Sequence, residues 1–323
     1  MKHLIFPGLF MLFTLHAFAQ TRCDCYDRLL NLGMSYEERY QFQKAIEVFK
    51  DALNFMEESN DDVEIFQGLA RCYDTLANYD SSVVYAMKAI DKGLGAGYFY
   101  SYTPKTFEFL PNDERLLWPR PGQEVNWGLF KLTQQMFGAD QYFRTTENFE
   151  SQWLPDSLEQ YKMPIILSLF HLADSNNYVL QMKIFRKFGW PSYNKVGFFN
   201  AMDVRGLMHN VRYPGFGRHL LDTLYVFGRN CEGIRTSKVL KLEDNRIFHG
   251  GDLVKGSGKN LIGFSGADRY NRIYNLKNAD SIRLAYNMLR LKEDVPPGET
   301  LPKDYKPIPY PKNYFCLKKY QLQ

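Results

Sequence analysis

The chain of 323 residues is 45% hydrophobic and 24% charged, which is typical of globular proteins and excludes a disordered chain or a collagen-like polymer. Forty Lys and Arg against 36 Asp and Glu leave a net charge of +4, too weak and dispersed to indicate a nucleic-acid-binding protein. The length predicts two domains, or one large domain with an appendage, and the 16% aromatic content indicates bulky packing surfaces.

The N-terminal segment 1–19 has the features of a secretory signal peptide. Lys2 is followed by an apolar stretch over residues 4–15 and then by the small-residue cleavage pattern Ala17-Phe18-Ala19. The stretch is too short for a membrane span, and no later segment reaches the roughly 18 apolar residues that a span needs. We therefore expect cleavage near Ala19, export to the periplasm or beyond the cell, and a mature chain without a transmembrane segment.

Cysteine usage fits an exported protein. Five cysteines allow two disulfides and leave one thiol over, although the sequence does not fix their connectivity. The first two are separated by one residue, which is shorter than the usual spacer of a zinc motif, and the others occur singly. We therefore expect structural cysteines and neither a metal nor a cofactor. The five are Cys23, Cys25, Cys72, Cys231 and Cys316.

A helical pattern occurs twice between residues 26 and 90, within a predicted module spanning residues 20–92. Seven apolar or small residues of the first copy recur 37 positions later. The aligned sets are Leu29, Leu32, Gly33, Tyr36, Ala45, Phe49, Ala52 and Phe66, Leu69, Ala70, Tyr73, Ser82, Ala86, Ala89. Their internal spacing is similar to that of the tetratricopeptide repeat, so this stretch resembles a pair of such repeats. An unrelated four-helix segment is the alternative.

The resemblance implies that each copy folds as a helical hairpin. Small residues at positions 33, 45, 52, 70, 82 and 89 should let paired helices approach closely, while Tyr36, Phe49 and Tyr73 fill the gaps beside them. Two repeats are fewer than the roughly three that bury a continuous core, so a cap is required. The aromatic run 98–102 suits that capping role better than the alternative, an outward ligand patch.

We expect a connector over residues 93–125, irregular over the proline-rich stretch 103–125, and a helix-rich domain over residues 126–292. Apolar residues at three- and four-residue steps predict a helix over 126–147. Asp140 and Arg144 lie on or beside its apolar face, where an unpaired charge is costly. They form either a structural ion pair or the polar floor of a binding cleft.

A second helix is predicted to begin after Asp174, which suits an N-cap, and to end at Gly189, which supplies a left-handed residue. Further helical segments are expected, and glycine-rich loops at 250–266. The whole chain is therefore predicted to be mainly α. The further segments cover residues 196–209, 219–227, 237–247 and 280–291.

Short motifs occur in a fixed order within this domain. They are Asp140-Gln141-Tyr142-Phe143-Arg144, Asp174 with Asn177, Gly189-Trp190-Pro191, Val196-Gly197 and His209. In that order the domain resembles an exported bacterial domain family of unknown function, with DQ-x-x-R, GWP followed by VG, and a helical His. The resemblance implies export and no established reaction.

His209 is the best candidate for acid–base chemistry, because imidazole titrates near neutral pH; a structural histidine is the alternative. An enzyme would require Asp140, Arg144, Asp174 and His209 to converge around one pocket. A complete phosphate-binding loop, a nucleophile elbow and an H-E-x-x-H motif are all missing from the sequence.

The tail, residues 293–323, holds six of the 15 prolines together with Tyr305, Tyr310 and Tyr314. This predicts an extended segment without helix. It either wraps along its own domain, which the rings favour, or docks in a partner's groove. The sequence thus predicts an exported interaction module that binds a protein or peptide partner. The alternative is an enzyme acting on a small molecule or polymer through Asp140, Arg144 and His209.

Overall fold

The computed structural model describes the greater part of the chain, with side chains from residue 22 onward except at some helical positions. Within the described ranges regular structure is helical and no β-strand occurs, which confirms the predicted mainly α fold. The described residues are 6–56, 63–112, 116, 124–144, 159–191, 195–196, 217–230, 233–248, 273, 276–311 and 314–320.

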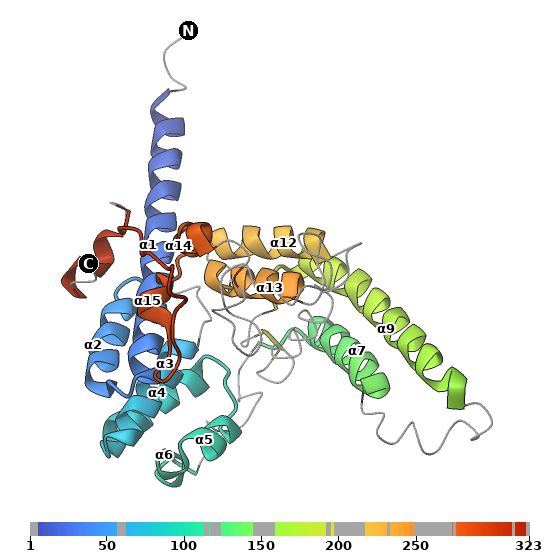
Figure 1. The fold of residues 1–323 in the computed structure, drawn as a ribbon. Coiled ribbons are helices and arrows are strands. Elements are labelled where there is room, and N and C mark those ends of the chain that lie inside the picture. The colour runs from blue at the N-terminus through green and yellow to red at the C-terminus, as the bar shows by residue number, and fades with distance from the viewer. Residues whose placement is uncertain are drawn as a thin grey trace.

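The helices follow one another with short connections in the N-terminal part and longer ones afterwards (Figure 1). No helix among the described residues is long and apolar enough to cross a bilayer. In chain order the elements are α1 (Phe6–Glu38), α2 (Phe42–Leu53), α3 (Glu64–Thr75), α4 (Tyr79–Asp91), α5 (Gly97–Tyr102), α6 (Pro104–Glu108), α7 (Trp127–Arg144), α9 (Glu159–Phe188), α12 (Gly217–Arg229), α13 (Thr236–Phe248), α14 (Leu276–Ala285), α15 (Leu291–Asp294) and the 3₁₀ helix η5 (Phe315–Tyr320).

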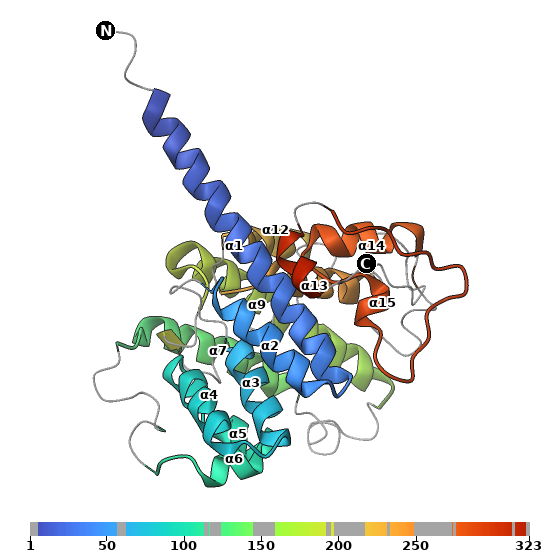
Figure 2. The same ribbon diagram turned by 90° about the vertical axis from the view of Figure 1, so that its left-hand side faces the viewer.

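The helices α1 to α4 form two hairpins, α1 with α2 and α3 with α4, and α2 packs on α3 (Figure 2). The small residues at the six predicted positions are all buried. Phe49 lies between the hairpins, and a Cβ atom added to Gly33 or Gly68 would be 2.4 Å or 2.7 Å from its ring. The two glycines therefore let the ring lie directly against the backbones of α1 and α3.

The turns within the two hairpins have the same conformation. Tyr40 and Ala77 both adopt a left-handed backbone, with φ of 60° and 55°. In each turn the next amide donates to the carbonyl five residues earlier, at 2.9 Å both times, as in a Schellman motif. The two turns are 37 residues apart, the same interval as the sequence pattern, so the duplication extends to the backbone.

The aromatic run after α4 has two roles. Phe99 on α5 is fully buried in the core of the hairpins, as the capping role requires. Tyr100 and Tyr102 on the same short helix are 67% and 64% exposed. The prediction of irregular structure over 103–125 is wrong at residues 104–108, which form α6, because Pro104 occupies the first position of the helix, where no amide is needed.

In the second half of the chain α7 packs on α9 and α12 packs on α13 around a second apolar core. The helix expected over 126–147 is present as α7. The prediction that Asp174 is an N-cap is wrong: α9 begins at Glu159, because the apolar run before Asp174 continues the helix, and the Asp174 side chain is buried. Gly189 ends α9 with a φ of +69°, as predicted.

The C-terminal strap, residues 295–311 and 314–320, packs along α14 and α15 of the second half of the chain and then returns to the N-terminal hairpins. Tyr314 and Leu317 are buried in the same core as α1 and α2. The prediction of a tail without helix is wrong for η5, where these two residues, three positions apart, bury one side of a 3₁₀ turn. The chain therefore closes on itself near α1.

Candidate functional site

Of the four predicted polar residues, only Asp174 has a described side chain. Asp140 and Arg144 belong to the last turns of α7, and their side chains lie outside the described residues, as does His209 altogether. Asp174 is buried in α9, whereas His171, one turn earlier, is exposed. The convergence of these residues on one pocket stays a prediction.

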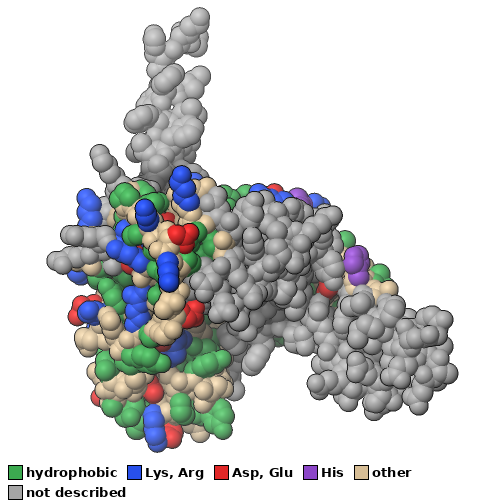
Figure 3. Space-filling model, viewed as in Figure 1, with side chains coloured by type: hydrophobic (Ala, Val, Ile, Leu, Met, Phe, Trp, Pro, Cys, Tyr) green, Lys and Arg blue, Asp and Glu red, His purple; other side chains and the backbone are tan. Residues whose placement is uncertain are grey.

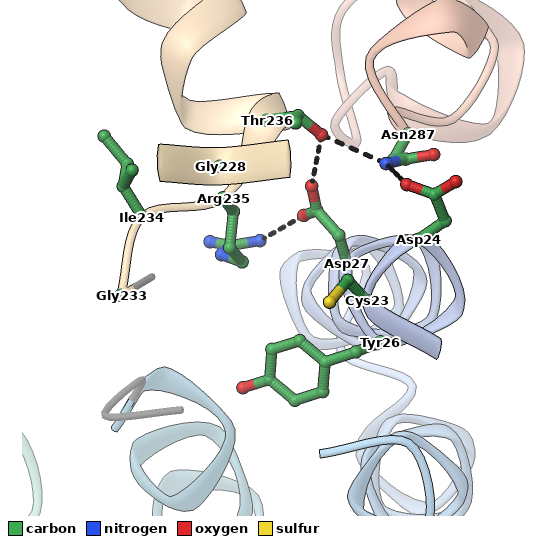
Figure 4. A pocket seen from close by; sticks show the side chains of 10 residues that line it. All are labelled: Cys23, Asp24, Tyr26, Asp27, Gly228, Gly233, Ile234, Arg235, Thr236 and Asn287. Atoms are coloured by element: carbon green, nitrogen blue, oxygen red, sulfur yellow. Dashed lines mark hydrogen bonds and ion pairs between the residues drawn. The ribbon is translucent and has the colours of Figure 1, made fainter. Parts of the chain in front are cut away.

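A buried polar junction that the sequence did not indicate centres on Asp27 of α1 (Figure 4). Arg235 Nη1 donates to one of its carboxylate oxygens at 3.0 Å, and so do Ser237 Oγ at 2.6 Å and Asn31 Nδ2 at 3.1 Å. The other oxygen accepts from the Ser237 amide and from Thr236 Oγ1, each at 3.1 Å. Asp27 therefore caps the N-terminus of α13 from another helix.

Arg235 extends this junction to the second hairpin. Besides Asp27 it pairs with Glu64 at the start of α3, and Lys238 pairs with the same carboxylate. Burial alone would raise the pKa of Glu64, but the charges of Arg235 and Lys238 hold it well below its ordinary value. The carboxylate is therefore ionised, and α1, α3 and α13 are tied together by charge.

Asn287, in the turn after α14, continues the junction from a left-handed backbone with a φ of 62°, a conformation that Asn tolerates. Its amide nitrogen donates to Asp24 Oδ1 at 2.7 Å and to Thr236 Oγ1 at 3.0 Å. Its side-chain oxygen accepts from Arg28 Nε at 2.9 Å, and its carbonyl accepts from Asn31 at 3.2 Å. The turn is therefore locked onto the polar face of α1.

Further along the same face, α1 holds the backbone of α15. Ser35 and Arg39 both donate to the carbonyl of Glu293, and Arg39 also reaches the carbonyls of Lys292 and Val295 at 3.3 Å. The side of α1 that points away from its hairpin is thus covered by the chain's own C-terminal part.

The cavity at this junction, lined by Cys23, Asp27 and Asn287 among others, has a volume of about 20 Å³. Such a volume holds a single water molecule and no organic substrate. Both oxygens of Asp27 are already occupied by donors, and no group of three metal-ligating side chains occurs in the described part of the chain. The junction is therefore a structural connection and not a catalytic pocket.

Among the described residues, a partly exposed aromatic cluster lies on α4, α5 and α6, away from the polar junction. We call this cluster, Tyr79, Tyr100, Tyr102, Phe107 and Phe109, the aromatic face. Rings of α4, α5, α6 and the residue after α6 contact one another in pairs there, stacked or edge-on, and hydrophobic side chains gather over this end of the molecule in Figure 3. The ring centroids are 5.3 Å apart for Tyr79–Phe109, 5.4 Å for Tyr100–Phe107 and 4.5 Å for Tyr98–Tyr102.

The aromatic face is attached to α3 by hydrogen bonds on its buried side. Asp74 of α3 accepts the amide of Thr106 at 2.8 Å and its hydroxyl as well, and Thr106 is fully buried. Beside the rings, Lys105 and Glu108 form an exposed ion pair of 3.1 Å. The aromatic face is therefore anchored to α3, with one exposed ion pair beside it.

Comparisons of the chain with protein-family models, curated proteins and solved structures gave no match.

Proposed function

We propose that the protein is an exported interaction module that binds a partner protein through the aromatic face. The observation that carries this proposal is the exposure of Tyr100, Tyr102 and Phe109, at 67%, 64% and 57%, on or directly after two short helices that are anchored by the fully buried Phe99 and Thr106. Clustered exposed rings are characteristic of protein interfaces, where Tyr and Phe are enriched.

The fixed geometry of the rings favours binding. Tyr100 stacks edge-on against Phe107, and Tyr79 stacks on Phe109, so each ring already occupies one orientation. A partner that covers them loses little additional side-chain entropy, because these side chains are ordered beforehand. The binding free energy is then available from the apolar area that the partner buries.

The α1 face is a poor alternative binding surface. In tetratricopeptide-like hairpins a peptide partner would be expected along the first helix of each hairpin, but here the backbone of residues 287–295 already accepts hydrogen bonds from α1. A competing peptide would have to displace the chain's own buried residues.

The charges around the aromatic face indicate the chemistry of the partner segment. Lys105 and Glu108 are paired with each other, so neither is an open partner for an acidic or basic segment. The tyrosine hydroxyls can donate hydrogen bonds to peptide carbonyls. We expect an uncharged, extended segment with apolar or prolyl side chains.

The test is a triple variant, Tyr100→Ser, Tyr102→Ser and Phe109→Ser, compared with a control that removes two equally exposed rings elsewhere, Tyr40→Ser and Trp127→Ser. An envelope protein enriched by the wild type is purified, and its Kd for each variant is measured by calorimetry. We expect the Kd to rise about 100-fold for the triple variant, since interface rings contribute about 1 kcal/mol or more each, and to change less than about threefold for the control.

Either of two results would contradict the proposal. One is a partner that binds the triple variant as tightly as the wild type. The other is the failure of the wild type to enrich any envelope protein beyond what the triple variant enriches.

A further inference from the structure

Two thiols from opposite ends of the chain meet beside the N-terminal core. Cys25 lies on α1 and is fully buried, and Cys316 lies on η5 and is partly buried against the same core. α1 and η5 are in contact, and the two thiols and Arg28 lie close enough to shift the pKa of both cysteines. No cysteine pairing could be deduced from the sequence, because 290 residues separate them.

The 3₁₀ helix that carries Cys316 is held firmly on both sides of it. Before it, the Arg28 guanidinium lies 3.8 Å from the centre of the Tyr314 ring. After it, Leu317 is buried and Lys319 Nζ lies 2.7 Å from Asp51 of α2. Cys316 is therefore kept beside α1 by contacts that do not involve Cys25.

We propose that Cys25 and Cys316 form a disulfide that fastens the C-terminal strap to α1. The neighbouring Cys23, two residues earlier on the same helix, is already disulfide-bonded, so this turn of α1 already carries one such bond. Both thiols are free in the structure, which is the reduced state of the pair. The inference does not depend on the proposed function.

The chemistry requires an external disulfide as oxidant, either glutathione disulfide or the disulfide of a thiol oxidase. Cys316 reacts first, because it is the more exposed of the two and because Cys25 and Arg28 lower its pKa. Its thiolate attacks one sulfur of the oxidant, and the other sulfur leaves as a thiol. Cys25 then attacks the mixed disulfide at the sulfur of Cys316 and releases the second thiol. Two protein thiols are oxidised and one oxidant disulfide is reduced to two thiols.

The test is peptide mapping of the full chain after incubation with glutathione disulfide and alkylation of remaining thiols. Cleavage before aspartate releases Asp24-Cys25-Tyr26, because Asp27 follows, and so separates Cys25 from Cys23. Trypsin releases residues 313–318 with Cys316. We expect these two peptides to be linked, in the wild type and in the Cys72→Ser control, and Cys25 to be alkylated in Cys316→Ser. Oxidation should raise Tm by about 5 °C in the wild type but not in Cys316→Ser.

The proposal is overturned if Cys25 and Cys316 are both recovered as alkylated thiols from the wild type after the incubation with glutathione disulfide. It is equally overturned if Cys316 is recovered joined only to glutathione, since Cys25 would then have failed to complete the exchange.

Discussion

Phe49 shows how one side chain sets the distance between three helices. It belongs to α2 and is fully buried. Its ring contacts the backbone of α1 at Gly33 and the backbone of α3 at Gly68. The sequence pattern indicated Phe49 as a gap filler and Gly33 as a small residue. Gly68 was not among the aligned positions, because the residue 37 positions earlier is Asn31, which is neither small nor apolar. Asn31 donates a hydrogen bond to Asp27 in the polar junction. The two hairpins thus share a pattern but not every role.

The first residue-scale prediction concerns this contact. Gly68→Ala should destabilise the protein by about 2 kcal/mol, because the new methyl group would lie 2.7 Å from a ring that the core does not allow to move. This loss exceeds the gain of about 1 kcal/mol in helix propensity that alanine brings. Urea unfolding followed by far-UV circular dichroism measures the change.

Gly138→Ala on α7 is the matched control, because its added Cβ meets no atom within 4 Å. It should be neutral or stabilising by up to about 1 kcal/mol. A Gly68→Ala protein as stable as this control would show that Phe49 does not fix the spacing of the hairpins.

At the scale of elements, three tyrosines hold the C-terminal strap. Tyr305 Oη donates to Asp280 at 2.8 Å, Tyr310 Oη to Glu293 at 3.3 Å, and Tyr314 Oη to the carbonyl of Leu284. The sequence predicted that rings would make this segment wrap onto its own chain. It could not predict where, because the acceptors of these hydroxyls, two carboxylates and one backbone carbonyl, belong to α14 and α15 and had no distinguishing pattern.

These hydroxyls predict a loss of stability at alkaline pH. Burial raises the pKa of all three tyrosines above the ordinary value, with further contributions from Asp280 and Glu293. A pKa raised by folding means that the stabilisation is complete below the unfolded value of about 10 and is lost as the pH rises beyond it. Tm should therefore fall more steeply above pH 10 than between pH 8 and pH 9.

The comparison that isolates this effect is a triple variant with Phe at positions 305, 310 and 314. It should have a lower Tm at pH 8, because three hydrogen bonds are lost, but a shallower fall above pH 10. Tyr100→Phe, at an exposed position, should follow the wild type throughout. Parallel alkaline curves for the wild type and the triple variant would refute the assignment.

The spacing of apolar residues along the sequence predicted some helices correctly and missed others. Apolar spacing predicted α7, α12 and α13, because each buries one stripe of residues. It failed at the start of α9, where residues 159–173 are apolar on several sides and give no clear boundary. It also failed at α5 and α6, since helices this short depend on their anchoring to α3 and carry no full period of their own.

At the scale of the whole molecule, the chain is closed by contacts between its two ends. One apolar core contains Leu29 of α1, Phe66 of α3 and Leu317 of η5. The hydrogen bond from Arg235 to Asp27 spans 208 residues of sequence. No sequence pattern links such distant partners, so the predicted picture of a repeat module followed by a separate domain missed this closure. It is also the reason why α1 offers no open groove.

Hydrogen–deuterium exchange of α1 tests this closure directly. In a chain that ends at Asp294, and so lacks the C-terminal strap, we expect peptides covering residues 24–38 to exchange at least about tenfold faster than in the full chain, because Tyr314 and Leu317 no longer cover them. Peptides of α9, which belongs to the other core, should exchange at unchanged rates. Unchanged protection of residues 24–38 in the shortened chain would contradict the account, since the C-terminal strap would then contribute nothing to the covering of α1.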